Sequence, residues 1–478
     1  MKTSVLLLIT IITTLLLITP TLPAIPQKTA KNSDTQLIII TYPFFKKTLE
    51  DLKVHKETYG ISTQIITTND IYKGNYFPSQ GRDKQEQIKY FIKNAKEHWN
   101  TTDILLVGNH WRVPIRTIYL ESDTGGAYEE THYASDLYYA DLYNQDFSFA
   151  SWDTNNNQIY GEWPWPEDAE QIDHMDLTPD INVGRLACIN QKEVQTVVDK
   201  IITYETQTYN SDWFNNFVLV GGDTFEPEYE NGTDYSEGEI ACEHAKTLMS
   251  SFNPLTCYAS HNTITAEHIK TALNTGAGFA YFMGHGSPRT FATHYNDPPY
   301  NWTEDFDQHQ ITSLSNNYKL PILMIGGCHN SHITTTPLNL IKGILTKGPF
   351  YFITIGEGFP DYYKYDWLRE TWSWVFVKHE SGGAIATIGS IGYGWVDTGD
   401  ENHDSIPDVI QGSDGWFETH FFDLYHNHNI STLGDLYSQT ITDYKNMFST
   451  TQDRYDAKVL STHILLGDPT LKIGGYPQ

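Results

Sequence analysis

Apolar runs and helical spacings alternate along the first part of the chain. Residues 37–40 are four aliphatic residues in succession, which predicts a fully buried strand. Residues 61–68 and 104–108 predict two more strands, with a helix between them at residues 85–98. Residues 193–205 carry an apolar stripe at helical spacing and predict another helix. Strands that alternate with helices indicate a parallel sheet covered by helices.

A second alternating series begins near residue 217. A helix is predicted at residues 238–252, and strands are predicted at residues 217–222, 277–283, 321–325, 350–355 and 383–388. The predicted fold class is therefore α/β, with two tandem subdomains that each hold a mostly parallel sheet flanked by helices. We place an N-terminal subdomain with a long loop region at residues 35–208, and a C-terminal subdomain at residues 210–475.

The N-terminal residues follow a different pattern. Lys2 precedes an apolar stretch from Val5 to Ile18, and prolines and an alanine follow that stretch. A basic start, a short apolar run and a small-residue exit are typical of a secretory signal peptide, which we place at residues 1–25. An uncleaved anchor is the alternative, because the run approaches the length of a membrane span. No other run is that long, so we expect a secreted, extracellular chain without a stable membrane anchor.

Charge and composition narrow the choice of partners. The chain has 59 acidic and 31 basic residues, which gives a net charge of −28. This argues against nucleic acid as a partner, because phosphate binding needs clustered Lys and Arg. Hydrophobic residues make up 39 % and charged residues only 19 % of the chain, so the composition is that of a globular protein and not of a disordered one.

Two of the predicted strands end in a glycine-flanked reactive residue. Residues 278–284 lead to His285, and residues 320–327 lead to Cys328. Ligands bind at the edge of an open α/β sheet where parallel strands end, so neighbouring strands would set an imidazole opposite a thiol there. A lone Gly-His-Gly is usually a turn, and a lone cysteine after an apolar run is usually inert. Their occurrence together is what indicates a catalytic pair.

The chemistry of such a pair is consistent with peptide hydrolysis. A free thiol has a pKa of ~8.5 and is only slightly ionised at neutral pH, so it needs a base such as His285. The imidazole would take the thiol proton and later protonate the leaving amine. The neighbouring glycines let backbones approach closely. We expect the amides of Gly286 and Cys328 to stabilise the oxyanion of the tetrahedral intermediate.

A hydrophobic block ending in His-Gly, followed by a second block ending in Gly-Cys, resembles the caspase-type cysteine peptidases. Residues 180–186 and 465–471 extend this resemblance to the gingipain-type family within that group. The resemblance implies two caspase-like subdomains, with His285 and Cys328 as catalytic residues on the second. It also implies a secreted cysteine endopeptidase that cleaves polypeptide substrates through a thioester intermediate.

Two other classes of function stay open. One is a catalytically silent protein that keeps the peptidase fold for binding or for a surface role. The intact pair of His285 and Cys328 argues against it, because a scaffold needs neither group. The other is a metal-dependent hydrolase of a different class. Thiol alkylation would separate the three, since only the cysteine peptidase loses all activity.

By resemblance to the family, a carboxylate that orients the histidine is expected between the first strand of the second subdomain and His285. Glu239 is our first choice, with Asp223 and Glu237 behind it. Such a carboxylate would fix the orientation of the imidazole.

The resemblance also implies a pocket wall after the strand predicted at residues 383–388. We expect Ser390 and Trp395 to contact the substrate there, with Trp395 as a flat lid over an aliphatic or basic side chain. A core position is the alternative for Trp395. The preferred substrate residue stays open.

Two loops have the oxygen-rich spacing of calcium sites. In the first, the predicted ligands of a structural calcium ion are Asp153, Asn155, Asn157, Ile159 and Glu162. Gln158 stands where such loops prefer glycine, so a plain Asx-rich turn is the alternative. A second acidic loop contains Asp397, Asp400, Glu401, Asp404 and Asp408. A zinc site at Cys328, His329 and His332 is a weaker hypothesis without an apparent fourth ligand. We predict no organic cofactor.

The remaining cysteines have structural interpretations. Cys188 lies in an apolar, strand-like context and is expected to be buried. Cys242 and Cys257 are close in sequence, and outside the cell they could close a small disulfide loop. The oligomeric state stays open.

Overall fold

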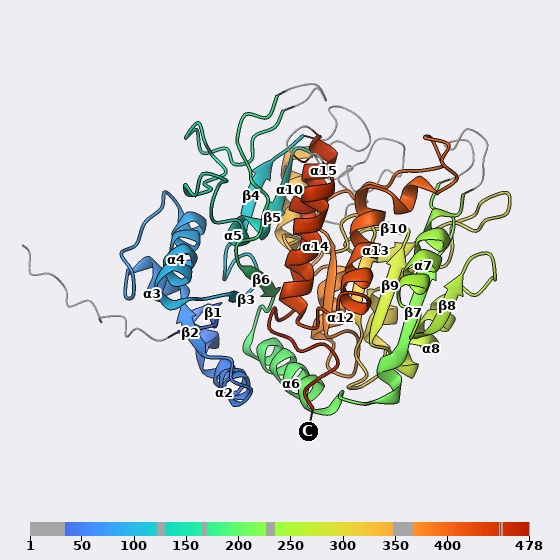
Figure 1. Ribbon diagram of the computed structural model, residues 1–478, viewed down its shortest axis with the longest axis horizontal. Coiled ribbons are helices and arrows are strands. Elements are labelled where there is room, and N and C mark those ends of the chain that lie inside the picture. The colour runs from blue at the N-terminus through green and yellow to red at the C-terminus, as the bar shows by residue number, and fades with distance from the viewer. Residues whose placement is uncertain are drawn as a thin grey trace, which may run out of the picture.

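The computed structural model describes residues 34–121, 130–164, 170–225, 235–347, 367–448, 450 and 453–477. The predicted signal peptide at residues 1–25 and the strand predicted at residues 350–355 lie outside these ranges. Figure 1 shows the first sheet, which runs from blue to green, on the left, and most of the second sheet, in green to orange, on the right. In the described ranges, every helix is too short or too polar to cross a membrane.

The first sheet is wholly parallel, with the strand order β2-β1-β3-β6. Every residue of β1 and β3 is buried, as expected for a parallel sheet with both faces covered. The strands are β1 (Leu37–Thr41), β2 (Thr63–Thr67), β3 (Asp103–Val107) and β6 (Asn182–Leu186). The helices of this subdomain are η1 (Pro43–Leu49), α2 (Glu50–Thr58), α3 (Thr68–Tyr72), α4 (Lys84–Trp99), α5 (Leu137–Ala140) and α6 (Gln191–Gln207).

Local signals set the helix ends in this subdomain. The Asp83 side chain caps α4 by accepting a hydrogen bond of 2.8 Å from the N–H of Glu86. Asn100 ends α4 in the left-handed conformation, with φ of 55°. In the described part of the loop region, β4 (Arg116–Tyr119) and β5 (His132–Ser135) pair as antiparallel strands. Hydrogen bonds from side chains stabilise the long irregular segments that follow.

The second sheet has the strand order β15-β14-β13-β9-β7-β8, in which only β15 is antiparallel to its neighbour. The strands are β7 (Asn216–Gly221), β8 (Asn253–Tyr258), β9 (Phe279–Met283), β13 (Ile322–Gly326), β14 (Ala386–Ser390) and β15 (His463–Leu466). A small antiparallel sheet follows β9 and comprises β10 (His285–Gly286), β11 (Thr290–Ala292) and β12 (Phe306–Asp307).

Helices cover both faces of the second sheet, and alternate strand residues enter two separate apolar clusters. The helices are η2 (Asp212–Asn215), α7 (Glu237–Leu248), α8 (Ala266–Thr275), α9 (Gln308–Thr312), α10 (Pro337–Lys347), α12 (Trp372–Lys378), η4 (Asp408–Ile410), α13 (Ser413–His426), α14 (Leu433–Met447) and α15 (Arg454–Thr462). In Figure 1, α14 and α15 stand in red between the two subdomains.

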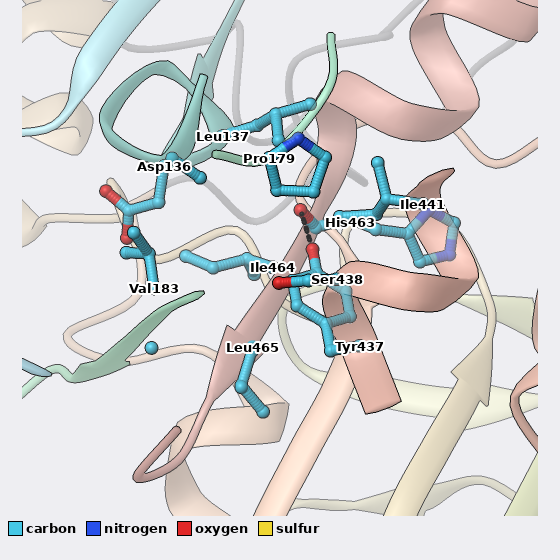
Figure 2. A pocket seen from close by; sticks show the side chains of 12 residues that line it. Asp136, Leu137, Pro179, Val183, Tyr437, Ser438, Ile441, His463, Ile464 and Leu465 are labelled. Carbon is cyan, nitrogen blue, oxygen red and sulfur yellow. Dashed lines mark hydrogen bonds between the residues drawn. The ribbon is translucent and has the colours of Figure 1, made fainter. Parts of the chain in front are cut away.

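The two subdomains meet where β6 and β15, the edge strands of the two sheets, face each other. Figure 2 shows a small pocket there, lined from both sides, in which the Tyr437 hydroxyl donates to the His463 carbonyl at 2.9 Å. Nearby, the buried ammonium of Lys56 lies 2.8 Å from carboxylate oxygens of both Glu205 and Asp468. A shared buried ion network therefore joins α2 and α6 to the C-terminal segment.

The sequence left open a disulfide between Cys242 and Cys257, and in the structure both are free thiols. Cys242 on α7 belongs to the apolar cluster on one face of the second sheet, whereas Cys257 on β8 belongs to the cluster on the other face. Closeness in sequence does not become closeness in space here, since the sheet itself separates the two side chains. Cys188 is buried and free, as expected.

Candidate active site

The strand register places His285 and Cys328 at matched positions. Strands β9 and β13 are parallel neighbours, and Met283 pairs with Gly326. His285 and Cys328 each follow that pair by two residues, at the carboxyl edge of the sheet. Both side chains line one pocket, as the sequence predicted.

Glycines allow the two reactive loops to touch. A Cβ on Gly327 would lie 3.3 Å from the backbone N and Cα of Gly286, and a Cβ on Gly286 would lie 2.9 Å from the Cys328 carbonyl oxygen. Asn330 ties the same loops together, because its amide donates to the carbonyls of Ser287 (2.8 Å) and Thr290 (3.0 Å). The glycines thus permit contact between the loops themselves, in addition to the close approach of a substrate that the sequence predicts.

A backbone carbonyl orients the imidazole of His285. Its Nε2 lies 2.6 Å from the Thr224 carbonyl oxygen, and since a carbonyl only accepts, Nε2 carries the proton. This tautomer leaves the lone pair on Nδ1, which suits a base. The rings of Phe225, His294 and Trp302 pack around the imidazole with centroids 5.1 to 5.7 Å away. The base is therefore held in a fixed tautomer and a fixed position.

Burial favours the neutral forms of both groups. It lowers the pKa of His285 to about 4, and the nearby His294 adds to the effect. Burial raises the pKa of the Cys328 thiol to about 11, although a contact from Sγ to the Gly394 carbonyl at 3.9 Å opposes this. At neutral pH, the resting pair is therefore a thiol beside a neutral imidazole, not a thiolate–imidazolium ion pair.

The structure does not bring Glu239 to His285. The Glu239 carboxylate accepts hydrogen bonds from the N–H (2.8 Å) and hydroxyl (2.5 Å) of Ser260. Glu237, one of the two reserve choices, is fully buried, and its Oε2 accepts from the N–H of Thr224 at 3.2 Å. A carboxylate therefore acts on the histidine indirectly, by holding the peptide that holds the ring.

Asp223, the other reserve choice, contributes through its backbone. It exchanges two backbone hydrogen bonds with His294, at 3.2 and 2.9 Å, and its carbonyl accepts from the Thr293 hydroxyl at 2.5 Å. These bonds fix the segment before Thr224. No residue type in the sequence signals a backbone carbonyl as the partner of a histidine, so the sequence could not reveal Thr224.

The geometry of β10 is compatible with the predicted oxyanion site. The backbone N–H of Ser287 donates to the Thr290 carbonyl at 3.0 Å, so these two residues form a hydrogen-bonded pair. Gly286 and Phe291 form the next pair along the antiparallel ladder. Hydrogen-bonded and non-hydrogen-bonded pairs alternate in such ladders, so the N–H of Gly286 points away from β11. The oxyanion role of Gly286 and Cys328 stays a prediction.

Trp395 lies in the wall of the pocket and Ser390 does not. Trp395 shares the pocket with Cys328, and its backbone N–H donates to Oδ2 of Asp414 at 2.9 Å. Ser390 is buried in β14, and its hydroxyl donates to the Gly392 carbonyl at 3.1 Å. The expected substrate contact of Ser390 is therefore wrong, because the side chain points into the core. Asp414 was not predicted.

A second pocket lies beside the catalytic pocket, and Trp395 and Val396 line both of them. Three carboxylates line it, from Asp397, Asp453 and Asp456. Burial raises the pKa of Asp397 and of Asp456, and in each case neighbouring acids add to the rise. The wall beyond Trp395 is therefore acidic.

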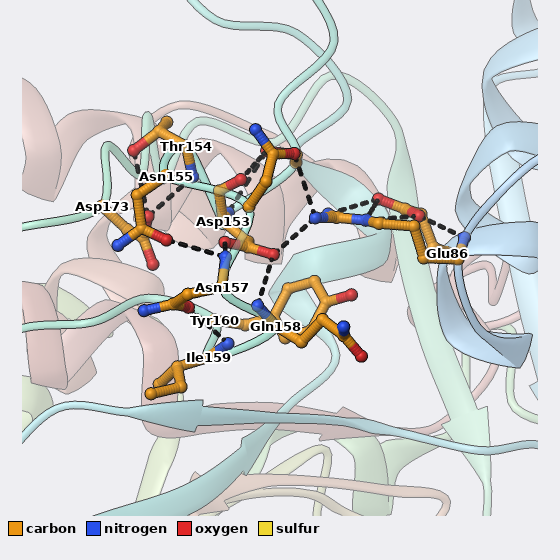
Figure 3. Close-up of polar contacts among 12 residues, drawn as sticks. Glu86, Asp153, Thr154, Asn155, Asn157, Gln158, Ile159, Tyr160 and Asp173 are labelled. Carbon is orange, nitrogen blue, oxygen red and sulfur yellow. Dashed lines mark hydrogen bonds and ion pairs between the residues drawn. The ribbon is translucent and has the colours of Figure 1, made fainter.

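The first predicted calcium loop forms one compact turn, shown in Figure 3. The N–H of Asn157 donates to Oδ1 of both Asp153 (3.0 Å) and Asn155 (2.9 Å), and the N–H of Ile159 donates to Oδ1 of Asn157 at 2.7 Å. Glu162 accepts from the side-chain amides of Asn155 and Asn157. The five predicted residues therefore gather in one place, with Arg82 2.5 Å from Oδ2 of Asp153.

The second acidic loop repeats this geometry. The N–H of Asp404 donates to Oδ1 of Asp400 (3.0 Å) and of Asn402 (2.9 Å), and the N–H of Ile406 donates to Oδ1 of Asp404 at 2.8 Å. Asp408 accepts from the N–H of Glu401 at 2.7 Å. In the described residues, no Lys or Arg forms an ion pair with Asp400, Asp404 or Asp408.

The zinc hypothesis at Cys328, His329 and His332 is wrong for the described residues, where these atoms do not form a ligand cluster. His329 has φ of 57°, and its Nδ1 lies 3.1 Å from the Ile391 carbonyl. The turn directs this ring to another backbone, so adjacency in sequence does not become a shared site.

Comparisons with known proteins agree with this geometry. The model of peptidase family C25 matches residues 30–474. Gingipain R2 of Porphyromonas gingivalis strain W83 is 22 % identical over 297 residues, which is 62 % of this chain and 32 % of that protein. Gingipain R1 of Porphyromonas gingivalis is 21 % identical over 297 residues, which is 62 % of this chain and 24 % of that protein. The chain thus spans a third or less of the length of these curated relatives.

Solved structures show the same fold. The complex of Porphyromonas gingivalis RgpB pro- and mature domains matches with a TM-score of 0.59 at 17 % identity, covering 92 % of this chain and 79 % of that chain. The crystal structure of the Arg specific cysteine proteinase gingipain R matches with a TM-score of 0.58 at 17 % identity, covering 93 % and 80 %. The predicted caspase-like α/β fold is therefore confirmed. With a family match across nearly the whole chain, this protein belongs to peptidase family C25, the gingipain family.

Proposed function

We propose that this family member is an active cysteine endopeptidase, with Cys328 as nucleophile and His285 as general base. The observation that carries the proposal is the matched register that sets both side chains in one pocket at the carboxyl edge of the second sheet. Membership of peptidase family C25 supports the same reaction class.

The reaction starts from the neutral pair. The Cys328 thiol passes its proton to Nδ1 of His285 as the sulfur attacks the carbonyl carbon of the scissile peptide bond. The amides of Gly286 and Cys328 stabilise the resulting oxyanion. The carbon–nitrogen bond then breaks, the imidazolium protonates the leaving amine, and a thioester remains. Water hydrolyses the thioester with His285 as base, which restores the thiol.

The acidic wall favours a substrate with a basic side chain beside the cut bond. Trp395 separates the catalytic pocket from the pocket lined by Asp397, Asp453 and Asp456. A Lys or Arg side chain that crosses the indole would reach these carboxylates. The description of one solved structure of this fold as an Arg specific proteinase supports this proposal.

Two calcium ions brace the long loops, one in the loop of Asp153 and one in the loop of Asp400. The repeated backbone geometry supports this assignment, because in both loops backbone N–H groups bind side-chain oxygens at the same spacing. Since Arg82 already pairs with Asp153, the loop of Asp400 is expected to bind calcium more tightly. The ions hold structure and take no part in the chemistry.

Calcium removal tests this assignment. EGTA should lower the midpoint of thermal unfolding of the wild-type protein. In Asp404→Asn this effect of EGTA on the midpoint should be largely lost, and in Asp153→Asn it should be reduced to a smaller extent. Asp51→Asn, an exposed acid outside both loops, is the control. An unfolding midpoint that is unchanged by EGTA in the wild-type protein would overturn the calcium assignment.

The protein is proposed to be secreted, on the pattern of residues 1–25. Sequencing the N-terminus of the protein recovered from the culture medium tests this proposal. A mature start near residue 26 would support secretion, and a full-length chain in the membrane fraction would support the uncleaved anchor.

Cleavage of a peptide library tests the activity. The purified protein, with calcium and a reductant, is incubated with peptides that vary the residue before the cut bond, beside Cys328→Ala. Cleavage by the wild type alone, with preference for Lys or Arg, is expected. Cleavage by both proteins would contradict the nucleophile assignment. Cleavage by neither, with Cys328 shown to be a free thiol, would favour the catalytically silent alternative.

A further inference from the structure

A buried cluster of three side chains with metal-ligand chemistry lies beside the end of β13. Asp414 and Glu418 are one helical turn apart on α13, and His463 begins β15. Their ligand atoms lie within 4.8 Å of one another, and the residues are 4 %, 0 % and 1 % exposed. In the described residues this is the one such group of three. The proposed reaction uses neither Glu418 nor His463.

Each of the three side chains is held by a hydrogen bond from outside the cluster. Nδ1 of His463 lies 2.7 Å from the Val459 carbonyl, so Nδ1 carries the proton and Nε2 is left with a lone pair. The Tyr281 hydroxyl donates to Oε2 of Glu418 at 2.7 Å. The N–H of Trp395 donates to Oδ2 of Asp414 at 2.9 Å. Metal-ligating histidines and carboxylates are typically oriented by such outer hydrogen bonds.

Two of the three residues offer the cluster an unsatisfied atom. Oε1 of Glu418 and Nε2 of His463 lie 3.9 Å apart, and neither has a hydrogen-bond partner among the described residues. Both side chains have no exposed area. In the described residues, neither Asp414 nor Glu418 forms an ion pair with Lys or Arg. A buried carboxylate oxygen and a buried imidazole nitrogen that lack partners are costly, and a cation bound between them would satisfy both.

We propose that Asp414, Glu418 and His463 bind one Zn²⁺ ion as a structural site. Imidazole together with carboxylate suits zinc, whereas calcium takes about six to eight oxygen ligands. Zinc bonds of ~2.0–2.2 Å place neighbouring ligand atoms ~3.3–3.6 Å apart in a tetrahedron, which small movements from the present spacing would reach. A water molecule would supply the fourth ligand.

The position of the cluster suggests what the ion stabilises. A Cβ on Gly326 would lie 2.6 Å from Oε2 of Glu418, so the cluster directly abuts the strand end that carries Cys328. His463 pairs with Ser390 across β14 and β15. The zinc ion would therefore fasten α13 to β15 and support the floor of the catalytic pocket, to which Asp414 contributes.

Metal stoichiometry tests the proposal without reference to activity. Every protein carries Cys328→Ala, so that the catalytic thiol cannot bind zinc, and is dialysed against Zn²⁺ and then against metal-free buffer. Elemental analysis should find one zinc per chain, and zinc should raise the midpoint of thermal unfolding. Glu418→Gln and His463→Gln should each abolish both effects. His420→Gln, on the same helix but outside the cluster, should preserve both effects.

A milder variant keeps the test valid if those substitutions prevent folding. Tyr281→Phe removes only the hydroxyl that orients Glu418, and it should weaken zinc affinity by about 10–100-fold. Co²⁺ bound in place of zinc should give the visible absorption bands of nitrogen and oxygen ligands, without a thiolate charge-transfer band. The proposal is overturned if the chain retains no zinc, or if Tyr281→Phe and Glu418→Gln bind zinc as tightly as the parent protein.

Discussion

The carboxyl edges of the two parallel sheets differ in whether their polar groups are used internally. In the first sheet, the buried guanidinium of Arg185 binds both oxygens of Asp136, at 2.5 and 2.7 Å. It also donates to the carbonyls of Gly108 (2.9 Å) and Val113 (2.8 Å). Hydrogen bonds within the fold therefore close this edge.

The second sheet leaves its edge open for chemistry. Strands β9 and β13 end in glycine-flanked loops, and the side chains after those ends, His285 and Cys328, line a pocket. The fold fixes one nitrogen of His285 through Thr224 and leaves the other for proton transfer. The same parallel architecture thus closes one edge with internal hydrogen bonds and leaves a pocket with two titratable side chains at the other, and the side chains at the strand ends account for the difference.

His285→Ala should give the largest effect on the reactive edge. Loss of the base should lower kcat/KM by about 10²–10⁴-fold, because the thiol then has no acceptor for its proton. Measured kcat/KM with the best library peptide checks this, and thermal unfolding shows whether the variant remains folded. An unchanged rate would remove His285 from the reaction.

Asp136→Asn should affect the first edge alone. Breaking the buried pair leaves the Arg185 charge uncompensated, which should lower the free energy of unfolding by about 3–5 kcal/mol. Denaturant unfolding measures this, and kcat/KM of the folded fraction should stay unchanged. Glu380→Gln, which breaks the exposed pair with Lys192, is the control and should cause no measurable loss. If Asp136→Asn abolished catalysis while stability stayed intact, the division between the edges would fail.

Glu237→Gln and Glu239→Gln form a matched pair on α7. Glu237 positions Thr224, so its loss should lower kcat about tenfold with little change in KM, which is less than the about 10²–10⁴-fold that a general base itself contributes. Glu239 binds Ser260, so its loss should leave kcat within about twofold of the wild type. The reverse order of effects would restore Glu239 as the orienting acid.

The pH dependence should be the mildest effect. Because the folded pKa of His285 is about 4, kcat/KM at pH 5 should remain within about twofold of its value at pH 7. With a base of ordinary pKa near 6.5, kcat/KM would fall about 25-fold over that range.

The free energy of unfolding must be measured over the same pH range. Burial lowers the pKa of His110 to about 4 as well, so the unfolded chain binds more protons between pH 6.5 and 4 and stability falls as pH falls.

Local patterns in the sequence were sufficient to predict much of the fold. The aliphatic runs predicted β1, β3, β7, β9 and β13, because buried parallel strands are nearly continuous apolar segments. Helix α4 was predicted within one residue at each end by its apolar stripe. The antiparallel strand β15 was not predicted as a strand, because its place at the sheet edge depends on pairing with β14 and not on its own pattern.

The proposed catalytic pair could be located from the sequence, because each member follows a recognisable strand. The groups around it could not, since they come together only in the folded chain. The Thr224 carbonyl has no sequence signature, and Asp414, Glu418 and His463 are spread over two elements. Ser390 was misassigned for a related reason, because strand alternation directs its side chain inward.

Labelling of the four cysteines tests the central claim most directly. The folded protein is treated with a peptidyl chloromethyl ketone that carries a basic residue, and each cysteine is then examined by peptide mass spectrometry. We predict one adduct, on Cys328, that forms far more slowly in His285→Ala. Cys188, Cys242 and Cys257 should stay unlabelled, because all three are buried and none of them lines the pocket that holds His285. Labelling at one of these three, or equally fast labelling of Cys328 without His285, would contradict a reactive edge built from this pair.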